Sequence, residues 1–184
     1  SFCIVTAFAT RLGTTVVAAY QVALQAWLLA AYCIDGLAIT ATSLGGQLLG
    51  KGEREAHRLL ASRLVRLGLG VGVIFFLFYW LSEVWVLDFF TNRPEIIALL
   101  GTIWFWLAAS QPINALAYVY DGILFSARDF AFLRKRTIEA FFFVFLPLVL
   151  WGFLKMQSLL GLWLALIGLN GYRMLAGWWR CKRI

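Results

Sequence analysis

The sequence has 184 residues, of which 62% are hydrophobic and 17% aromatic, and its formal net charge is +7. A chain of this length cannot bury so much apolar surface in a soluble core, so a soluble globular domain is excluded and insertion into a lipid bilayer is expected. The charge does not indicate a nucleic acid partner, because the basic residues lie in short segments between apolar runs, where they act as topology signals.

Six apolar segments predict an all-α membrane protein with six transmembrane helices. A helix needs about 20 residues to cross ~30 Å of hydrocarbon at about 1.5 Å per residue. We expect helices over residues 1–19, 20–49, 58–88, 96–125, 137–154 and 158–179. Turn residues separate them, beginning with Gly13 in the first segment and continuing with Gly50, Gly52 and Pro94. Because Ser1 lies inside an apolar run, we also expect that the chain is truncated at its N-terminus.

The basic residues are distributed unevenly between the two membrane faces. If the helices alternate in direction, the second loop, the fourth loop and the tail share one face. That face holds thirteen basic residues: Lys51, Arg54, Arg58, Arg63, Arg66, Arg128, Arg134, Lys135, Arg136, Arg173, Arg180, Lys182 and Arg183. The opposite face holds Arg11, Arg93 and Lys155. Because short cytoplasmic loops are enriched in Lys and Arg, we expect a cytoplasmic C-terminus in a plasma membrane protein.

Residues for metal binding or catalysis are sparse and scattered. Cys3, Cys33, Cys181 and the single His57 have no spacing typical of a metal site or a disulfide framework. The sequence also has no phosphate-binding loop and no nucleophile beside a histidine. We therefore expect no metal, no bound cofactor and no enzymatic activity.

The carboxylates within the apolar segments include Asp35 in the second and Asp121 in the fourth. A charged side chain in the hydrocarbon region costs roughly 2.5–3.5 kcal/mol, so it usually faces protein or a water-filled cavity. Both residues are candidates for binding a coupling cation. For Asp35 the alternative is a protonated carboxyl group hydrogen-bonded to a neighbouring helix.

The fourth segment also carries a polar stripe. Gln111, Asn114, Tyr118 and Asp121 follow one another at helical spacing and project along one helix face. Pro112 lacks a backbone N–H and predicts a bend at this depth. One interpretation is that Gln111, Asn114 and Tyr118 line a substrate cavity. The other is that the amides form a contact between helices.

Two groups of residues resemble a known transporter family. In the fourth segment they are Gln111-Pro112-Ile113-Asn114, Tyr120-Asp121-Gly122-Ile123-Leu124 and Ala127-Arg128-Asp129. In the second they are Tyr20-Gln21-Val22-Ala23, Asp35-Gly36-Leu37-Ala38-Ile39 and Gly46-Gln47-Leu48-Leu49-Gly50. These runs resemble the tenth and eighth helices of multidrug and toxic compound extrusion (MATE) transporters, especially the DNA-damage-inducible F (DinF) subfamily.

The resemblance implies that residues 1–184 form the C-terminal lobe, helices seven to twelve of a twelve-helix transporter, which pairs with a missing N-terminal lobe. It implies an antiporter in the lipid bilayer that exports small organic compounds, often cationic or amphipathic, in exchange for protons or sodium. Asp121 matches the tenth-helix acid of cation coupling in some relatives. Ser126 departs from the family, since relatives often have Gly there, and the first-helix acid of this subfamily lies outside the chain.

Two alternatives remain open. A lipid-linked oligosaccharide flippase of the same superfamily needs cationic residues for a pyrophosphate headgroup. The sequence interpretation places only acidic or neutral groups at membrane depth, which disfavours it. A non-transporting membrane scaffold would use the polar stripe for assembly alone and would have no wet cavity.

Overall fold

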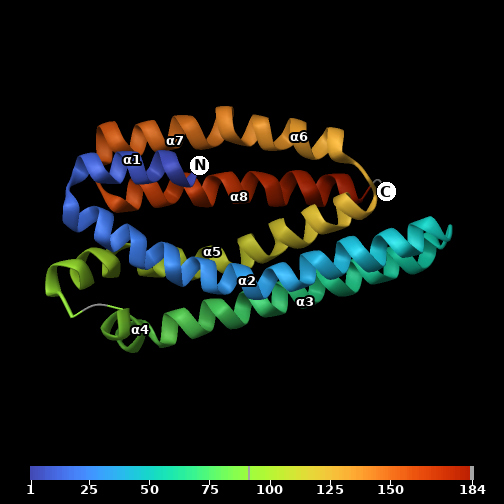
Figure 1. Cartoon of the computed structure of the whole chain (residues 1–184), viewed down its shortest axis with the longest axis horizontal. Coiled ribbons are helices and arrows are strands. Elements are labelled where there is room, and N and C mark those ends of the chain that lie inside the picture. Colours follow the sequence, from blue (N-terminus) through green and yellow to red (C-terminus); the bar gives the residue numbers. More distant parts are fainter. Residues whose placement is uncertain (91, 183–184) are drawn as a thin grey trace.

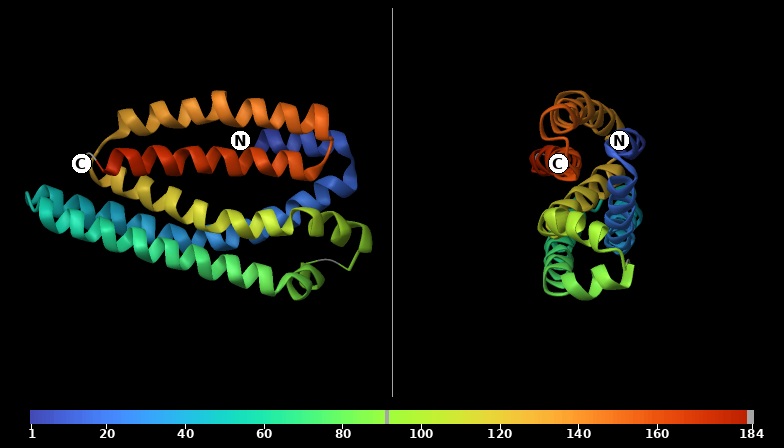
Figure 2. Two further views of the ribbon diagram at one scale, coloured as in Figure 1. Left: turned by 180° about the vertical axis from the view of Figure 1, so that it is seen from behind. Right: turned by 90° about the vertical axis from the view of Figure 1, so that its left-hand side faces the viewer.

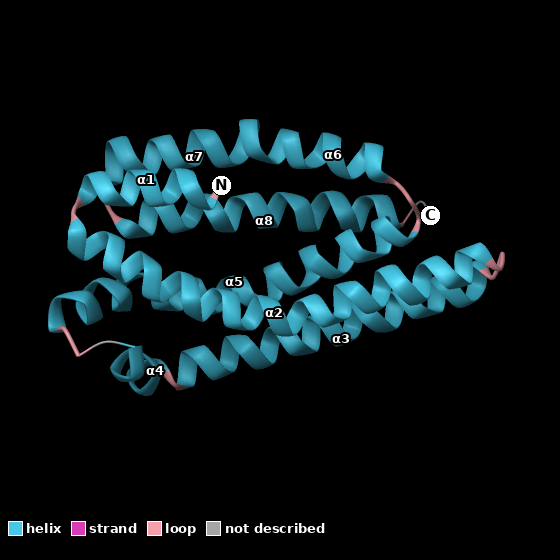
Figure 3. Ribbon diagram, viewed as in Figure 1, coloured by secondary structure: helices cyan, strands magenta, loops and turns pink. Residues whose placement is uncertain are grey.

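The computed structural model describes residues 1–90 and 92–182, and all of the regular structure in these residues is helical (Figure 3). Turns and short connections join the helices. The elements in chain order are α1 Phe2–Leu12, α2 Thr14–Gly50, α3 Arg54–Leu81, α4 Glu83–Phe90, α5 Pro94–Ser126, α6 Phe130–Glu139, the π-helical η1 Ala140–Phe145, α7 Leu146–Trp151, the π-helical η2 Gly152–Met156 and α8 Leu159–Cys181.

Five of the expected spans are long and apolar enough to cross a bilayer: α2, α3, α5, the continuous run Phe130–Met156, and α8. The first expected helix is shorter in the structure than predicted. Gly13 has a φ of 125°, a conformation that glycine adopts without strain, and it separates α1 from α2. The predicted boundary at residues 19–20 is therefore wrong, and the described first helix has 11 residues. At 1.5 Å per residue it measures about 17 Å, less than a bilayer core.

The third expected helix is also shorter than predicted. It was expected over residues 58–88, but α3 ends at Leu81 and the short α4 follows. Ser82 lies at the junction with a φ of −101° and a ψ of 17°, outside helical geometry. By contrast, α5 continues through Pro112 without interruption. The fifth expected helix begins earlier than predicted, at Phe130 rather than residue 137.

The helices run back and forth along one axis, with α5 between α2, α3 and α8 (Figures 1 and 2). The α2–α3 connection, the α5–α6 connection and the end of α8 lie at the same end of the bundle (Figure 1). We call this the basic end, because it carries the basic segments that the sequence places on one face. Viewed along the bundle, α6–α7 and α3–α4 form its opposite edges (Figure 2).

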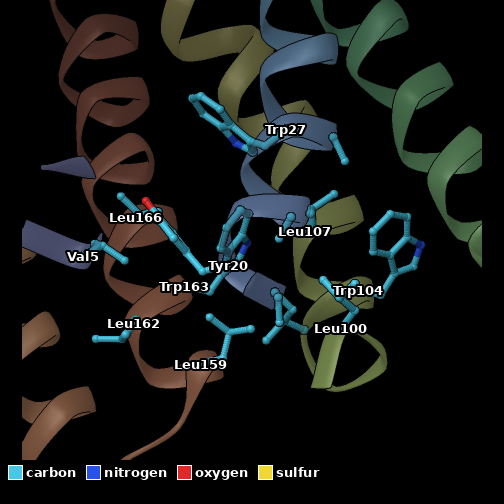
Figure 4. Packing of buried hydrophobic residues seen from close by; sticks show 14 of the residues in the cluster. Val5, Tyr20, Trp27, Leu100, Trp104, Leu107, Leu159, Leu162, Trp163 and Leu166 are labelled. Atoms are coloured by element: carbon cyan, nitrogen blue, oxygen red, sulfur yellow. The ribbon is translucent and has the colours of Figure 1, made fainter. Parts of the chain in front are cut away.

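The large buried side chains labelled in Figure 4 come mainly from the first halves of α2, α5 and α8. Tyr20 of α2 packs edge-on against Trp163 of α8, with ring centroids 6.3 Å apart. On the other side of α2, the Trp104 indole donates to the Tyr79 carbonyl over 2.8 Å, and the Tyr79 hydroxyl donates to the Ala26 carbonyl over 2.5 Å. These contacts join α2, α3, α5 and α8 into one core. The polar residues of interest lie between this core and the basic end.

Candidate functional site

The two candidate carboxylates, Asp35 and Asp121, line one groove between α2, α5 and α8. We call it the acidic groove; its volume is about 440 Å³, and its polar lining comprises Asp35, Thr42, Ser43, Tyr118, Asp121 and Arg173. Asp35 is exposed and has no hydrogen-bond or ion-pair partner among the described residues. Because no neighbour neutralises this carboxylate, it is available to a cation that enters the groove.

Two helices approach closely to form the floor of this groove. Gly122 of α5 lies against the α2 backbone, and a Cβ atom at this position would come within 2.5 Å of the Ala38 carbonyl oxygen. The Thr42 hydroxyl donates to the Ala38 carbonyl over 2.9 Å and also lies 3.3 Å from the Gly122 carbonyl. The glycine therefore lets α2 and α5 pack so tightly that Asp35 and Asp121 share one groove.

Asp121 is paired with Arg173 of α8 in a short hydrogen-bonded salt bridge. The two side chains keep 17% and 22% of their surface exposed, so the pair lies at the edge of the groove and not in open solvent. The Arg173 guanidinium also lies 5.7 Å from the centre of the Tyr118 ring. The partner of Asp121 lies 52 positions further along the chain, on another helix.

Arg173 itself was wrongly assigned to the C-terminal tail. It lies about 12 Å inside the end of α8, at 1.5 Å per residue from Cys181. The sequence around Arg173 does indicate a position inside the membrane segment. Arg173 follows Asn170 by one helical turn within an apolar run that continues to Ala176. The interpretation that polar groups at membrane depth are only acidic or neutral is corrected by this residue.

A chain of hydrogen bonds leads from the salt bridge into the interior. Arg173 donates to the Asn170 side-chain oxygen over 2.9 Å, and the Asn170 amide donates to the Asn114 oxygen over 3.0 Å. Asn114 in turn donates to the Ser110 hydroxyl over 3.3 Å. Asn114 and Asn170 are 2% and 5% exposed. This network joins α5 to α8 and holds Arg173 in position beside Asp121.

The polar stripe of α5 is thus divided between two roles. Tyr118 and Asp121 line the acidic groove, whereas Gln111 and Asn114 are buried and lie outside its lining. The Gln111 amide donates to the Leu107 carbonyl over 3.0 Å. Pro112 lies where Gly72 of α3 packs against α5, and a Cβ atom at Gly72 would come within 2.6 Å of the Pro112 Cα. Asn114 therefore takes part in a contact between helices, whereas the Gln111 amide bonds to a carbonyl of its own helix.

Charge balance determines which ligands the acidic groove favours. Two carboxylates and one guanidinium leave one negative charge when all three groups are ionised. Aromatic and aliphatic side chains, among them Ile39 and Phe125, complete the lining. A groove of this composition suits a proton, a metal cation or an organic cation with an apolar body.

The sequence profile of the family described as MatE matches residues 1–155. The chain belongs to the MatE family. The chain is similar to two proteins of Arabidopsis thaliana: it is 29% identical to Protein DETOXIFICATION 42 over 98% of its length, and 32% identical to "Protein DETOXIFICATION 44, chloroplastic" over 97%. It is also 27% identical, over 80% of its length, to Probable multidrug resistance protein NorM of Pasteurella multocida (strain Pm70). The resemblance to MATE transporters seen in the second and fourth segments is therefore confirmed at the level of the family.

This MatE chain spans about a third of the length of these relatives, 35%, 34% and 33% respectively. The all-α membrane architecture expected for one lobe of a MATE transporter agrees with the observed bundle, since the described residues contain five helical segments that are long and apolar enough to span a bilayer. The acidic groove is a property of this MatE chain itself, since α2, α5 and α8 supply all of its polar lining.

Proposed function

We propose that the chain is the C-terminal lobe of a DinF-like secondary transporter, and that it pairs with an N-terminal lobe to export small organic compounds in exchange for protons or sodium. The observation that supports this most directly is that Asp35 and Asp121 line one groove with a net negative charge. The names of the relatives refer to detoxification and multidrug resistance, which fits a substrate that is an organic, cationic or amphipathic compound.

In this proposal Arg173 acts as an internal cation that the transported ion must displace. While Arg173 is bound to Asp121, α5 and α8 are held together at the groove. Protonation of Asp121, or binding of sodium there, removes the attraction between these helices. A cation can shift a conformational equilibrium only if it binds one state more tightly than the other, and loss of this ion pair supplies such a difference.

Asp35 takes the complementary role in the proposal. Its carboxylate has no partner among the described residues, so it is the group that a cationic substrate or a second coupling ion would contact first. Tyr118 borders the same groove and offers an aromatic face to an organic cation. Export follows if the coupling ion and the substrate compete for the two carboxylates.

We further propose that the basic end faces the cytoplasm, since it gathers the segments richest in Lys and Arg. The expected location is the plasma membrane. One relative is named chloroplastic, so the location is tested by fluorescence microscopy of the full-length protein with a C-terminal tag. A tag degraded by protease added to the outside of intact cells would contradict the cytoplasmic orientation.

One observation favours the flippase alternative: Arg173 places a cationic side chain in the acidic groove, where a pyrophosphate headgroup could bind. The charge of Arg173, however, is balanced by Asp121, and Asp35 adds a further negative charge, so a pyrophosphate headgroup would be repelled. We therefore retain cation-coupled export as the proposed function. Binding of a dye-like organic cation in preference to a lipid-linked sugar separates the two.

The decisive experiment uses Asp121→Asn in the full-length protein. Export of a fluorescent organic cation is measured in membrane vesicles driven by an imposed proton or sodium gradient. We expect loss of gradient-driven export at normal expression, because the side chain can no longer exchange Arg173 for a coupling ion. Export at the wild-type rate would remove Asp121 from the mechanism.

The structure offers a matched control for this variant. Asp129 forms a second salt bridge to α8, with Arg180 over 2.6 Å, and neither residue lines the acidic groove. Asp129 lies in the connection between α5 and α6, so Asp129→Asn makes the same chemical change in another salt bridge to α8, outside the site. It is expected to preserve export. Equal loss in both variants would indicate a structural effect and would contradict the proposed role of the groove.

A further inference from the structure

A second groove lies on the other side of α5. It is formed by α3, α5 and α8 at the basic end and has a volume of about 580 Å³. We call it the basic groove; its charged lining comprises Arg58, Arg66 and Lys182, and it contains no Asp or Glu. Neither Arg66 nor Lys182 forms an ion pair among the described residues. Its charge is thus the reverse of that of the acidic groove.

The two grooves use opposite faces of one helix. Tyr118, Asp121 and Phe125 line the acidic groove, whereas Tyr120 and Ile123 line the basic groove. At about 100° per residue, these two sets lie roughly half a turn apart around α5. If the acidic groove faces a transport path through the protein, the basic groove faces away from it, toward the surrounding bilayer.

The basic groove is apolar on its walls and basic at its rim. Ala61 and Val65 of α3 and Ile123 of α5 supply aliphatic surface. Tyr120 packs closely on α8, because Gly177 has no side chain; a Cβ atom there would lie 2.6 Å from the Tyr120 Cβ. An apolar slot beneath a cationic rim matches a molecule with an acyl chain and an anionic head.

Trp178 marks the depth of this rim. Tryptophan is enriched where the hydrocarbon core meets the headgroups, and Trp178 lies in the last turn of α8. The Lys182 ammonium lies 3.7 Å from the centre of the Trp178 ring, so its charge is held over the groove. Arg66 remains close to its own helix through a 3.4 Å hydrogen bond from its Nε to the Ser62 carbonyl, which leaves the terminal guanidinium nitrogens for a ligand.

We propose that the basic groove binds an anionic phospholipid, with its phosphate between Arg66 and Lys182 and an acyl chain along Ala61, Val65 and Ile123. Basic pockets between transmembrane helices near the cytoplasmic leaflet favour anionic headgroups, since each Lys or Arg adds electrostatic attraction. The apolar walls require a lipid and not a free phosphate, which would leave them exposed to water. This inference rests on the proposed function for the orientation of the two grooves, but it does not depend on which ion drives transport.

The test is native mass spectrometry of the purified full-length protein titrated with phosphatidylglycerol or with phosphatidylcholine of the same acyl chains. We expect one phosphatidylglycerol to be retained at a concentration on the order of tenfold below that needed for phosphatidylcholine. The double variant Arg66→Gln with Lys182→Gln should lose this preference. Ala61→Trp should weaken retention without changing the charge, because the indole fills the slot.

A matched control removes the same number of charges elsewhere on α3. Arg54 and Arg63 are exposed and do not line the basic groove, so Arg54→Gln with Arg63→Gln should keep the preference. Equal loss in both double variants would indicate diffuse surface charge and overturn the proposal. Displacement of the lipid by soluble glycerophosphoglycerol at similar concentration would also overturn it, because the acyl chain would then contribute nothing.

Discussion

The Arg173 guanidinium on α8 donates a hydrogen bond to the Asp121 carboxylate on α5, and the two side chains line a groove that also contains Asp35, which has no ion-pair partner in the part of the chain that the structure describes. Arg173 is positioned for this contact by Asn170, which is bound in turn to Asn114. The acidic groove and the buried network are therefore parts of one arrangement, and each part is open to a separate test.

The first prediction concerns the cost of breaking the Asp121–Arg173 pair. Removal of one partner leaves the other charge partly buried and uncompensated, so Asp121→Asn should lower the free energy of unfolding by about 1–3 kcal/mol, below the values for fully buried pairs because both side chains are partly exposed. The double variant Asp121→Asn with Arg173→Gln should recover part of this loss. Thermal unfolding of the full-length protein in detergent measures both effects. Additive losses would contradict a direct coupling of the two charges.

Much of this arrangement follows from sequence periodicity, and its limits are physical. Hydropathy located the spans, and helical spacing placed Tyr118 and Asp121 on one face. Helical spacing could not predict which part of that face is exposed to solvent, because the burial of Asn114 depends on how α8 packs. Arg173 was misassigned because Arg180 and Lys182 follow it closely and resemble a continuous basic tail.

Helix boundaries failed for a related reason. Ser82 interrupts an expected single helix, but its neighbours Leu81 and Glu83 include no glycine or proline to indicate a break. Gly13 was recognised as a break, yet the apolar residues after it, which belong to α2, extended the expected first helix to residue 19. Apolar composition identifies membrane segments well but gives little information about where the backbone turns.

The second prediction concerns Gly122, where α5 meets the α2 backbone. Gly122→Ala should destabilise the protein by about 1–3 kcal/mol, since the added Cβ would come within 2.5 Å of the Ala38 carbonyl oxygen and the helices would have to separate. Gly46→Ala on α2 is the control, because nothing lies within 4 Å of its added Cβ. Alanine favours the helix there, so stability should stay equal or rise by up to about 1 kcal/mol. Thermal unfolding of both variants is the measurement, and equal stability would disprove the close contact.

The third prediction concerns the hydrogen bond between Asn114 and Asn170. Hydrogen bonds between helices in membranes contribute on average about 0.6 kcal/mol, with a maximum near 1.7 kcal/mol. A double-mutant cycle with Asn114→Ala and Asn170→Ala should give a coupling energy in this range. Ser110→Ala, at the end of the network, should couple more weakly to Asn170, since Asn114 stands between them. A coupling energy of zero between the two asparagines would show that they do not interact.

The fourth prediction tests which residues meet water, and with it the scaffold alternative. Single cysteines are introduced at Ser43 and at Asn114 in a full-length protein whose native cysteines have been replaced. Ser43 is exposed in the acidic groove, so its cysteine should react with a water-soluble maleimide in membrane vesicles. Asn114 is 2% exposed, so its cysteine should react only after unfolding in detergent.

Addition of an organic cation extends this experiment. A substrate that occupies the acidic groove should slow the labelling of the Ser43 cysteine, whereas a cysteine at Arg63, outside the groove and exposed on α3, should label at an unchanged rate. Protection at both positions would reflect a general effect on the reagent. A Ser43 cysteine that never reacts would mean that the groove is closed to water in the full-length protein, and neither Asp35 nor Asp121 could then receive a cation from solution by this path.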